Sequence, residues 1–291
     1  MLDPRRLRLL IQLESLGTVR AVAEAASMSP SAVSQQLAVL ERESGAALLE
    51  RHGRSVALTG AGVALVEHAR AILERMRAAE EDLRALRDAP AGVVRVASFT
   101  SAMRAFVIDA AAAARGAHPG ITVELAELEP DACVPALVRG EVDLAVVADF
   151  GDGTYRQDAA LRSVPLATDE LMAVTARSVP FSGELVALRD RPWLLDGTEL
   201  ERHVLRRCRA AGFEPRVVGR LFSHEALLFA VRSGLGVTVL PTFALGGVDG
   251  VAVRPLVPAA RRSLRVLHRE EALDRRSVAL ALEALVAAAH P

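Results

Sequence analysis

Two short amphipathic segments near the N-terminus show the clearest pattern of hydrophobic and polar positions in the chain. Apolar residues recur three or four positions apart over 19–26 and again over 30–44, which predicts two helices. Ser29 and Pro30 predict the start of the second helix, because a serine hydroxyl caps backbone N–H groups and proline loses no bond at the first helical position. Its apolar side comprises Val33, Leu37 and Leu40. Its outward side is short and polar, with Ser31, Ser34, Gln35, Ala38 and Arg42.

Two helices joined by a tight turn, with a polar face turned outward, are typical of a motif that reads DNA. A further amphipathic segment over 4–16 supplies a supporting helix. The candidate DNA contacts in this motif are Ser29, Pro30, Ser31, Ser34 and Gln35.

A basic hairpin is expected after the second helix, which Gly45 ends. Gly53 marks a turn between two short strand-like runs, and Arg51 and Arg54 lie on either side of it. Such a tip can reach phosphates or the minor groove, so both arginines are candidate DNA contacts. For Arg51 an alternative stays open, in which it caps helix carbonyls or pairs with Glu43.

A long helix is predicted from Thr59 to about residue 88, before the break at 89–92. Its apolar positions alternate in steps of four and three, which is a heptad seam. The seam comprises Leu65, Ala69, Ile72, Met76, Ala79, Leu83 and Leu86. So long a seam is seldom left facing water. It can pack on its own domain, but because the helix lies between a DNA reader and a second domain, we expect residues 61–90 to pair with a second copy of the chain. Such a dimer presents two DNA-reading helices to an inverted-repeat operator on double-stranded DNA.

From Gly92 onward, strand-like and helix-like segments alternate. The predicted strands are 93–97, 121–128, 144–147, 161–175, 192–195, 217–221, 237–240, 251–256 and 263–268, and the predicted helices are 102–116, 131–139, 199–211, 224–233 and 276–289. Alternation of this kind predicts an α/β domain with a parallel sheet and helices on both faces.

Ligands of such sheets bind beyond the carboxyl ends of the strands, where helix N-termini supply hydrogen bonds. Polar residues at the predicted strand ends are therefore candidate contacts for a small-molecule effector: Thr100, Ser101, Pro130, Asp149, Asp196, Thr198, Ser223 and His224. Each of these residues is also a reasonable turn or cap residue by itself. The set fits an organic acid, an amino acid or an aromatic metabolite equally well.

The 291-residue chain has a formal net charge of −1, and all 35 of its Lys-or-Arg positions are Arg. A global positive field is thus excluded, and any attraction to DNA must be local. The exclusive use of arginine fits a GC-rich genome, and it also supplies forked donors for phosphates and guanine. Cys133 and Cys208 belong to no metal-binding or disulfide pattern. No secretion signal or membrane-length apolar run is evident, so we expect a cytoplasmic protein with no membrane partner.

Motifs of the common enzyme classes are missing from the sequence. It contains no GxSxG elbow, HExxH helix or phosphate-binding loop, and its histidines are scattered. The sequence therefore predicts no catalytic residue, no metal and no cofactor. An enzyme with an α/β catalytic domain and a DNA-binding appendage is the alternative to a regulator, whereas a purely architectural DNA binder does not need the long α/β region.

The N-terminal segment resembles the signature of the LysR-type transcriptional regulators, a bacterial family. The resemblance rests on the helix-turn-helix followed by Leu48-Leu49-Glu50-Arg51 and by Leu58-Thr59-Gly60-Ala61-Gly62. Leu49 stands where the family often has Phe, and Gln35 where it often has Arg. The second departure is expected to change which base is read.

The resemblance implies three parts: a winged helix-turn-helix domain over 1–60, a linker helix over 61–90 and a periplasmic-binding-protein-like effector domain over 91–291. It also implies that the effector domain has two lobes, the first formed by about 92–162 with 264–291 and the second by about 163–263. In relatives the position of Ser101 contacts the effector. The resemblance also suggests three further properties: tetramer formation, contact with RNA polymerase and a redox role for either cysteine.

Overall fold

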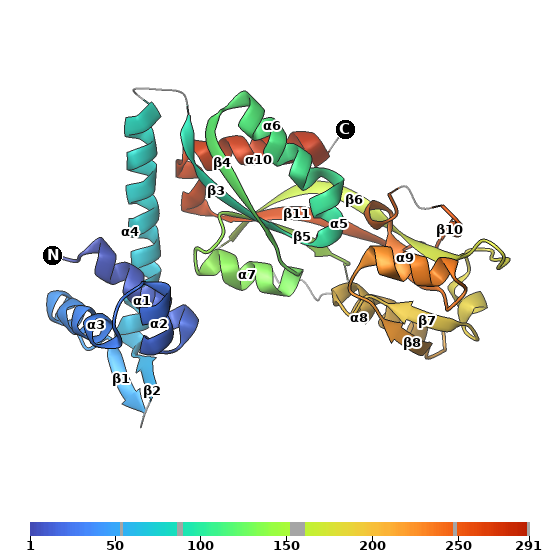
Figure 1. Ribbon diagram of the computed structural model, residues 1–291, viewed down its shortest axis with the longest axis horizontal. Helices are drawn as coiled ribbons and strands as arrows, with labels where there is room; N and C mark the ends of the chain where they lie inside the picture. Colours follow the sequence, from blue (N-terminus) through green and yellow to red (C-terminus); the bar gives the residue numbers. More distant parts are fainter. Residues whose placement is uncertain (53–54, 86–89, 152–160, 247–248, 290–291) are drawn as a thin grey trace. The chain divides into compact units, whose positions relative to one another are not determined.

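The computed structural model describes residues 1–52, 55–85, 90–151, 161–246 and 249–289. The chain divides into two compact units (Figure 1). Unit 1 comprises Met1–Asp88 with Glu271–Arg276, and unit 2 comprises Ala89–Glu270 with Ser277–Pro291.

Unit 1 is a winged helix-turn-helix followed by a long helix. Its helices are α1 (Pro4–Leu16), α2 (Val19–Ala25), α3 (Pro30–Ser44) and α4 (Gly60–Ala85). The wing is an antiparallel hairpin of β1 (Leu49–His52) and β2 (Ser55–Leu58). The apolar sides of these elements meet in one core that includes Leu7, Leu10, Leu13, Val22, Val33, Leu37, Leu40, Leu48 and Val66. The predicted order of helix, turn, helix and wing is confirmed.

Capping residues fix where the helices of unit 1 begin and end. The Ser29 hydroxyl accepts a hydrogen bond from the Ala32 N–H at 3.2 Å, and Gly45 ends α3 with a φ of 69°. The Thr59 hydroxyl accepts from the Gly62 N–H at 3.0 Å at the start of α4. Because both ends of α3 are fixed, burial of its apolar side determines which side faces water.

Unit 2 alternates strands and helices, as its sequence predicts. The strands are β3 (Ala91–Ser98), β4 (Gly120–Glu127), β5 (Leu144–Asp149), β6 (Leu161–Ala176), β7 (Pro192–Leu195), β8 (Arg216–Arg220), β9 (Thr238–Pro241), β10 (Val251–Pro255) and β11 (Arg261–Arg269). The helices are α5 (Thr100–Ala102), α6 (Ile108–Ala117), α7 (Pro130–Val138), α8 (Glu199–Ala210), α9 (His224–Arg232) and α10 (Arg276–Ala289). A π-helical turn, Met103–Val107, joins α5 to α6, and short 3-10 turns cover Leu185–Leu188, Thr242–Ala244 and Glu270–Asp274.

The main sheet of unit 2 is mixed, so the expectation of an all-parallel sheet is wrong. Strand β3 pairs in parallel with β4 and β5, and β7 pairs in parallel with β8. By contrast β11 runs antiparallel to both β5 and β6, and β6 runs antiparallel to β9 and β10. Hydrophobic periodicity shows that a strand is buried but gives no information about its direction, which here depends on long return connections.

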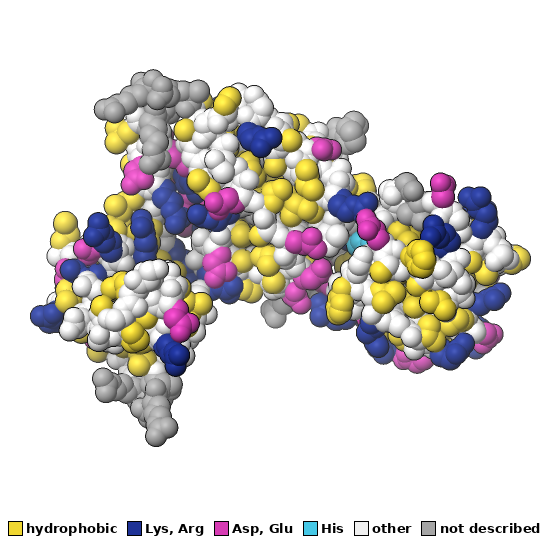
Figure 2. Space-filling model, viewed as in Figure 1, with side chains coloured by type: hydrophobic (Ala, Val, Ile, Leu, Met, Phe, Trp, Pro, Cys, Tyr) yellow, Lys and Arg dark blue, Asp and Glu magenta, His cyan; other side chains and the backbone are white. Residues whose placement is uncertain are grey.

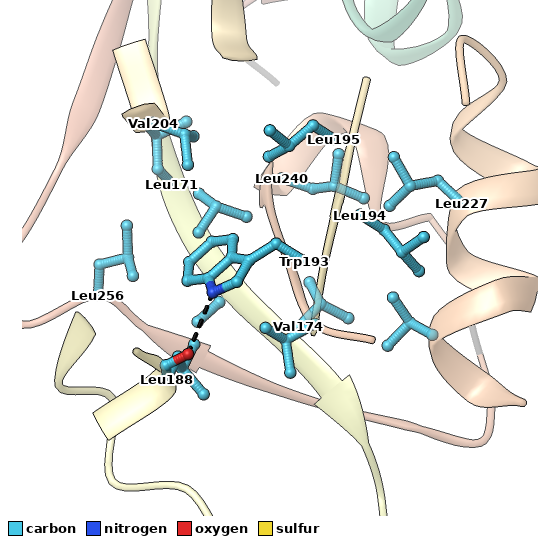
Figure 3. Packing of buried hydrophobic residues seen from close by; sticks show 14 of the residues in the cluster. Leu171, Val174, Leu188, Trp193, Leu194, Leu195, Val204, Leu227, Leu240 and Leu256 are labelled. Atoms are coloured by element: carbon cyan, nitrogen blue, oxygen red, sulfur yellow. Dashed lines mark hydrogen bonds between the residues drawn. The ribbon is translucent and has the colours of Figure 1, made fainter. Parts of the chain in front are cut away.

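Strands β6 and β11 extend through both halves of unit 2. One half contains β3–β5, α5–α7 and α10, and Figure 1 shows α6 and α10 on one side of its sheet and α7 on the other. The other half contains β7–β10, α8 and α9 and packs around Trp193, the only tryptophan in the chain. The Trp193 indole donates to the Leu188 carbonyl at 3.1 Å while leucine and valine side chains surround its ring (Figure 3). Each half therefore has its own hydrophobic core.

Candidate functional site

The outward face of α3 is a row of small polar side chains. Val33, Leu37 and Leu40 are buried, which turns the opposite side of the helix toward water. The exposed residues on that side include five predicted positions: Ser29, Pro30, Ser31, Ser34 and Gln35. Small side chains on an exposed helix let its backbone approach a groove closely, and hydroxyl and amide groups can bond to base edges.

The wing hairpin follows α3 directly, with Arg51 opposite Val56 in its backbone register. Arg54 lies outside the described residues, and so does the side chain of Arg51. The predicted role of both residues therefore stays a prediction.

The heptad seam of α4 divides into a packed part and an exposed part. Ala69 belongs to the core of unit 1, and Leu65 packs against that core. Farther along the helix Ile72 is 40% exposed and Leu83 65% exposed. An apolar row of this kind on one helix face is suited to a partner helix.

A cleft in unit 2 brings together most of the predicted effector contacts. It encloses about 430 Å³ of empty space, its open mouth included. Its lining contains six predicted residues: Thr100, Ser101, Pro130, Asp196, Thr198 and His224. The same lining contains Phe99, Glu129, Ala148, Phe150, Glu199, Leu200, Phe222, Pro241 and Arg262, which were not predicted. Residues from both halves of unit 2 thus face one space.

Two predicted residues, Asp149 and Ser223, do not belong to this lining. The Asp149 carboxylate accepts from the Gly151 N–H at 2.8 Å, which is a local turn. The Ser223 hydroxyl accepts from the Ala226 N–H at 3.3 Å and caps α9. For these two residues the structure shows the turn and cap roles that were their alternatives.

Arg262 lies at the back of the cleft and is bound to Asp169. Its Nε and Nη2 donate to Asp169 Oδ2 at 3.0 and 2.8 Å, and Nη2 also donates to Ser101 Oγ at 2.7 Å. Its guanidinium carbon lies 4.8 Å from the centre of the Phe99 ring. Burial raises the pKa of Asp169, while the charge and hydrogen bonds of Arg262 oppose that rise. The arginine is thus already neutralised by a buried partner.

The hydroxyl groups of the cleft differ in their availability to a ligand. Thr100 donates to Glu127 at 2.6 Å, and Thr198 donates to Asp196 at 2.7 Å while accepting from the Leu200 N–H at 3.2 Å. Ser101 accepts from Arg262, so its own proton can be donated to a ligand. Phe99 precedes α5 without giving it a side-chain cap, which leaves that helix end for a hydrogen-bond acceptor.

Two groups in the cleft have shifted pKa values. Partial burial, followed by the charges of Asp196, Asp131, Glu127 and Glu199, raises the pKa of Glu129 to about 7. Burial also lowers the pKa of His224, so its imidazole is neutral at neutral pH. The His224 Nδ1 atom is shielded from solvent and has no hydrogen-bond partner among the described residues.

Family models match both parts of the chain. Residues 4–63 match the bacterial regulatory helix-turn-helix protein, lysR family, and residues 87–290 match the LysR substrate binding domain. The chain belongs to the LysR family of transcriptional regulators. It is accordingly a DNA-binding regulator with an effector-binding domain, and not an enzyme.

Similar LysR proteins align over nearly the whole chain. The nitrogen assimilation regulatory protein nac of Klebsiella aerogenes is 29% identical over 252 residues, which are 85% of this chain and 81% of that protein. The structure of a full-length OxyR variant from Pseudomonas aeruginosa covers 98% of each chain at 22% identity with a TM-score of 0.71. LysG from Corynebacterium glutamicum, solved with its bound effector Arg, covers 99% of this chain and 98% of its own at 23% identity with a TM-score of 0.65.

Both cysteines of this LysR protein are free thiols buried in unit 2. Burial raises the pKa of both Cys133 and Cys208 to about 12, whereas a reactive thiol needs a lowered pKa. Among the described residues no group of three or more His, Cys, Asp or Glu side chains is placed to hold a metal ion. None of the described helices has the length and apolar character of a membrane-spanning segment.

Three residues that the sequence analysis missed are central to the geometry of the cleft. Glu129 directly precedes Pro130 at a strand end, so the strand-end rule applies to it as well. Phe222 is next to Ser223 and could have been found in the same way. Arg262 follows another arginine in a strand, and residue type gives no sign of which of the two is buried.

Proposed function

We propose that this LysR regulator binds an inverted-repeat operator as a dimer through the polar face of α3. The exposure of Ser31, Ser34 and Gln35 opposite a buried apolar side supports this proposal most directly. No described residue is hydrogen-bonded to the Gln35 amide, which can pair with an adenine edge in the major groove. Ser29 and Pro30 begin the helix, so they approach the phosphates.

Arg51 and Arg54 of the wing supply contacts to phosphate or to the minor groove in this proposal. Such contacts add affinity for every sequence and depend strongly on salt. Local basic groups are needed because the chain has a net charge of only −1.

Dimer formation is assigned to the linker helix over 61–90, through the exposed seam residues Ile72, Met76 and Leu83. Tetramers arise by a further association of effector domains, and contact with RNA polymerase is the step that follows DNA binding. A protein with these tasks acts on the chromosome, in the cytoplasm.

The cleft of unit 2 is the effector site in this proposal. The six lining residues predicted from the sequence are its contacts: Thr100, Ser101, Pro130, Asp196, Thr198 and His224. Ser101 has a proton to donate and stands at an uncapped helix end. Residues from both halves of the domain line the cleft, so a ligand bound there changes the equilibrium between arrangements of the two lobes, about 92–162 with 264–291 and about 163–263.

The decisive experiment selects bound sequences from a random pool of DNA duplexes with the full-length chain, and repeats the selection with Gln35→Ala. We expect an inverted repeat, and for the variant a relaxed preference at one base pair in each half-site with a loss of about 10- to 100-fold in affinity. Gln12→Ala removes the same amide from α1, outside the row of exposed α3 residues, and serves as control. An unchanged motif with Gln35→Ala would exclude the assignment of α3 as the base-reading helix.

A further inference from the structure

More acidic than basic side chains line the cleft. Arg262 is the only arginine or lysine among the described lining residues, and it forms its ion pair with Asp169. His224 is neutral at neutral pH, because burial lowers its pKa. Three carboxylic acids line the same space: Glu129, Asp196 and Glu199. Two of these acids, Glu129 and Asp196, therefore face the cleft without a cationic partner among its described lining residues.

Asp196 is the most buried of these acids, with only 4% of its surface exposed. Its two oxygens accept from the Thr198 N–H at 3.1 Å and from the Thr198 hydroxyl at 2.7 Å. A carboxylate has about four acceptor positions, so two neutral donors leave capacity for a charged one. Burial of an ionised carboxylate is costly unless an opposite charge is nearby.

Glu129 faces the same space from the other half of the domain. No described residue is hydrogen-bonded to its carboxylate, and the acids that act on it are Asp196, Asp131, Glu127 and Glu199. Partial burial, and then repulsion from these acids, raises the pKa of Glu129, so the empty cleft shifts its equilibrium toward the protonated form. An incoming cation reverses this preference.

Among the described residues, no arginine besides Arg262 lines the cleft, and Arg104, which acts on His224, lies 4.0 Å from Glu225. Asp131 is 3.7 Å from Arg202, and the charge of Arg262 is held by Asp169. Phe222, 75% exposed, belongs to the same lining as these acids, whereas the ring of Phe99 lies against Arg262 and that of Phe150 is stacked on His203. Aromatic faces beside carboxylates form a favourable environment for ammonium and guanidinium groups. Figure 2 shows several acidic side chains grouped on the face of unit 2 that it presents.

We propose that the effector of this regulator carries an ammonium or guanidinium group, bound between Glu129 and Asp196. This inference rests on the proposed role of the cleft as effector site and specifies the charge of the ligand. The Ser101 hydroxyl remains available for an acceptor on the same molecule.

The test uses three probes with five-carbon chains that differ in charge: 1,5-diaminopentane, glutarate and 1,5-pentanediol. Thermal unfolding and titration calorimetry of the full-length protein measure the binding of each probe at up to about 20 mM, since a ligand of the folded state raises its midpoint. We expect 1,5-diaminopentane to raise the midpoint and the other two to leave it unchanged. Calorimetry in buffers of different ionisation enthalpy should show proton release when the cation binds at pH 7, because the raised pKa keeps part of the Glu129 population protonated in the empty cleft.

Glu129→Gln and Asp196→Asn each remove one of the two proposed carboxylates. We expect each to weaken binding of 1,5-diaminopentane about tenfold or more, and Glu129→Gln also to abolish the proton release. Asp109→Asn is the matched control, because it removes an equal charge from an exposed residue of α6 that lies outside the lining and is not among the acids that act on Glu129, and it should change binding less than twofold.

The possible outcomes distinguish failure of the cationic ligand from failure of the cleft as effector site. Binding of glutarate that Ser101→Ala weakens would leave the cleft as effector site and overturn the cationic ligand. Binding of 1,5-diaminopentane that is equal in all three acid variants overturns the assignment to Glu129 and Asp196. If none of the probes binds while the operator is still bound, the cationic ligand is excluded and the sensing role of the cleft loses its support, whereas DNA binding is untouched.

Discussion

Replacement of Arg262 by methionine should destabilise unit 2 strongly. The side chains of Arg262 and Asp169 are 5% and 0% exposed, so the variant leaves a buried carboxylate without its counter-ion. Removal of one partner of a buried pair costs about 3–5 kcal/mol, and the lost bond to Ser101 adds about 1 kcal/mol. For a unit of this size each kcal/mol corresponds to about 2–4 °C, which gives a fall in midpoint of roughly 8–24 °C.

Urea unfolding followed by Trp193 fluorescence measures this cost, because Trp193 is the only tryptophan and is fully buried in unit 2. Arg261→Met is the matched control, since Arg261 is the exposed neighbour on the same strand, and it should change the free energy of unfolding by less than about 0.5 kcal/mol. The double variant Arg262→Met with Asp169→Asn removes the uncompensated charge and should recover about 2 kcal/mol. Equal costs for Arg262→Met and Arg261→Met, or strict additivity in the double variant, would refute the argument.

Three further results are expected. Cys133 and Cys208 should resist iodoacetamide at pH 8 in the native protein and react after unfolding in urea, because burial raises the pKa of each to about 12; rapid modification of the native protein would contradict this. Glu129→Gln should stabilise the protein at pH 8 by about 1 kcal/mol, and thermal unfolding should show that this gain vanishes toward pH 4.5. The raised pKa of Glu129 makes the wild type lose stability as the pH rises from 4.5 to about 7, and the variant avoids that loss. Exposure of the side chain to solvent screens the effect and keeps it small. Leu83→Glu on the exposed seam should lower the molar mass measured by light scattering, whereas Val63→Glu, 44% exposed but off the seam, should not.

Local elements were predictable from the sequence because their signals are local. The start of α3 follows from Ser29 and Pro30, its end from Gly45, and its buried side from the spacing of leucine and valine. The strands and helices of unit 2 follow from their alternation in the same way. The direction of β11 and the π-helical turn at Met103–Val107 were not predicted, because both depend on contacts between residues distant in sequence.

The cleft was predictable in position but not in charge. Strand ends identified six of its lining residues, since helix and strand boundaries can be read from caps and turns. Arg262 and Asp169, which form the ion pair, are 93 positions apart in the sequence, and Arg262 and Ser101 are 161 positions apart. A local sequence pattern therefore cannot predict either contact. Without knowledge of that pairing, Arg262 would count as a positive charge for an anionic ligand, and the sequence alone leaves the charge of the effector open.

The proposed cation site also supplies the energy difference that a regulator needs. Glu129 and Asp196 belong to opposite halves of unit 2, and each repels the other when the cleft is empty. A cation between them converts that repulsion into attraction, so it binds more tightly to the arrangement in which the halves approach. A ligand shifts an equilibrium only by its difference in affinity for the two states, and a tenfold difference contributes about 1.4 kcal/mol. Because β6 and β11 run through both halves and hold the Arg262–Asp169 pair, the cation changes the spacing of the two acids without replacing the charge that holds the domain together.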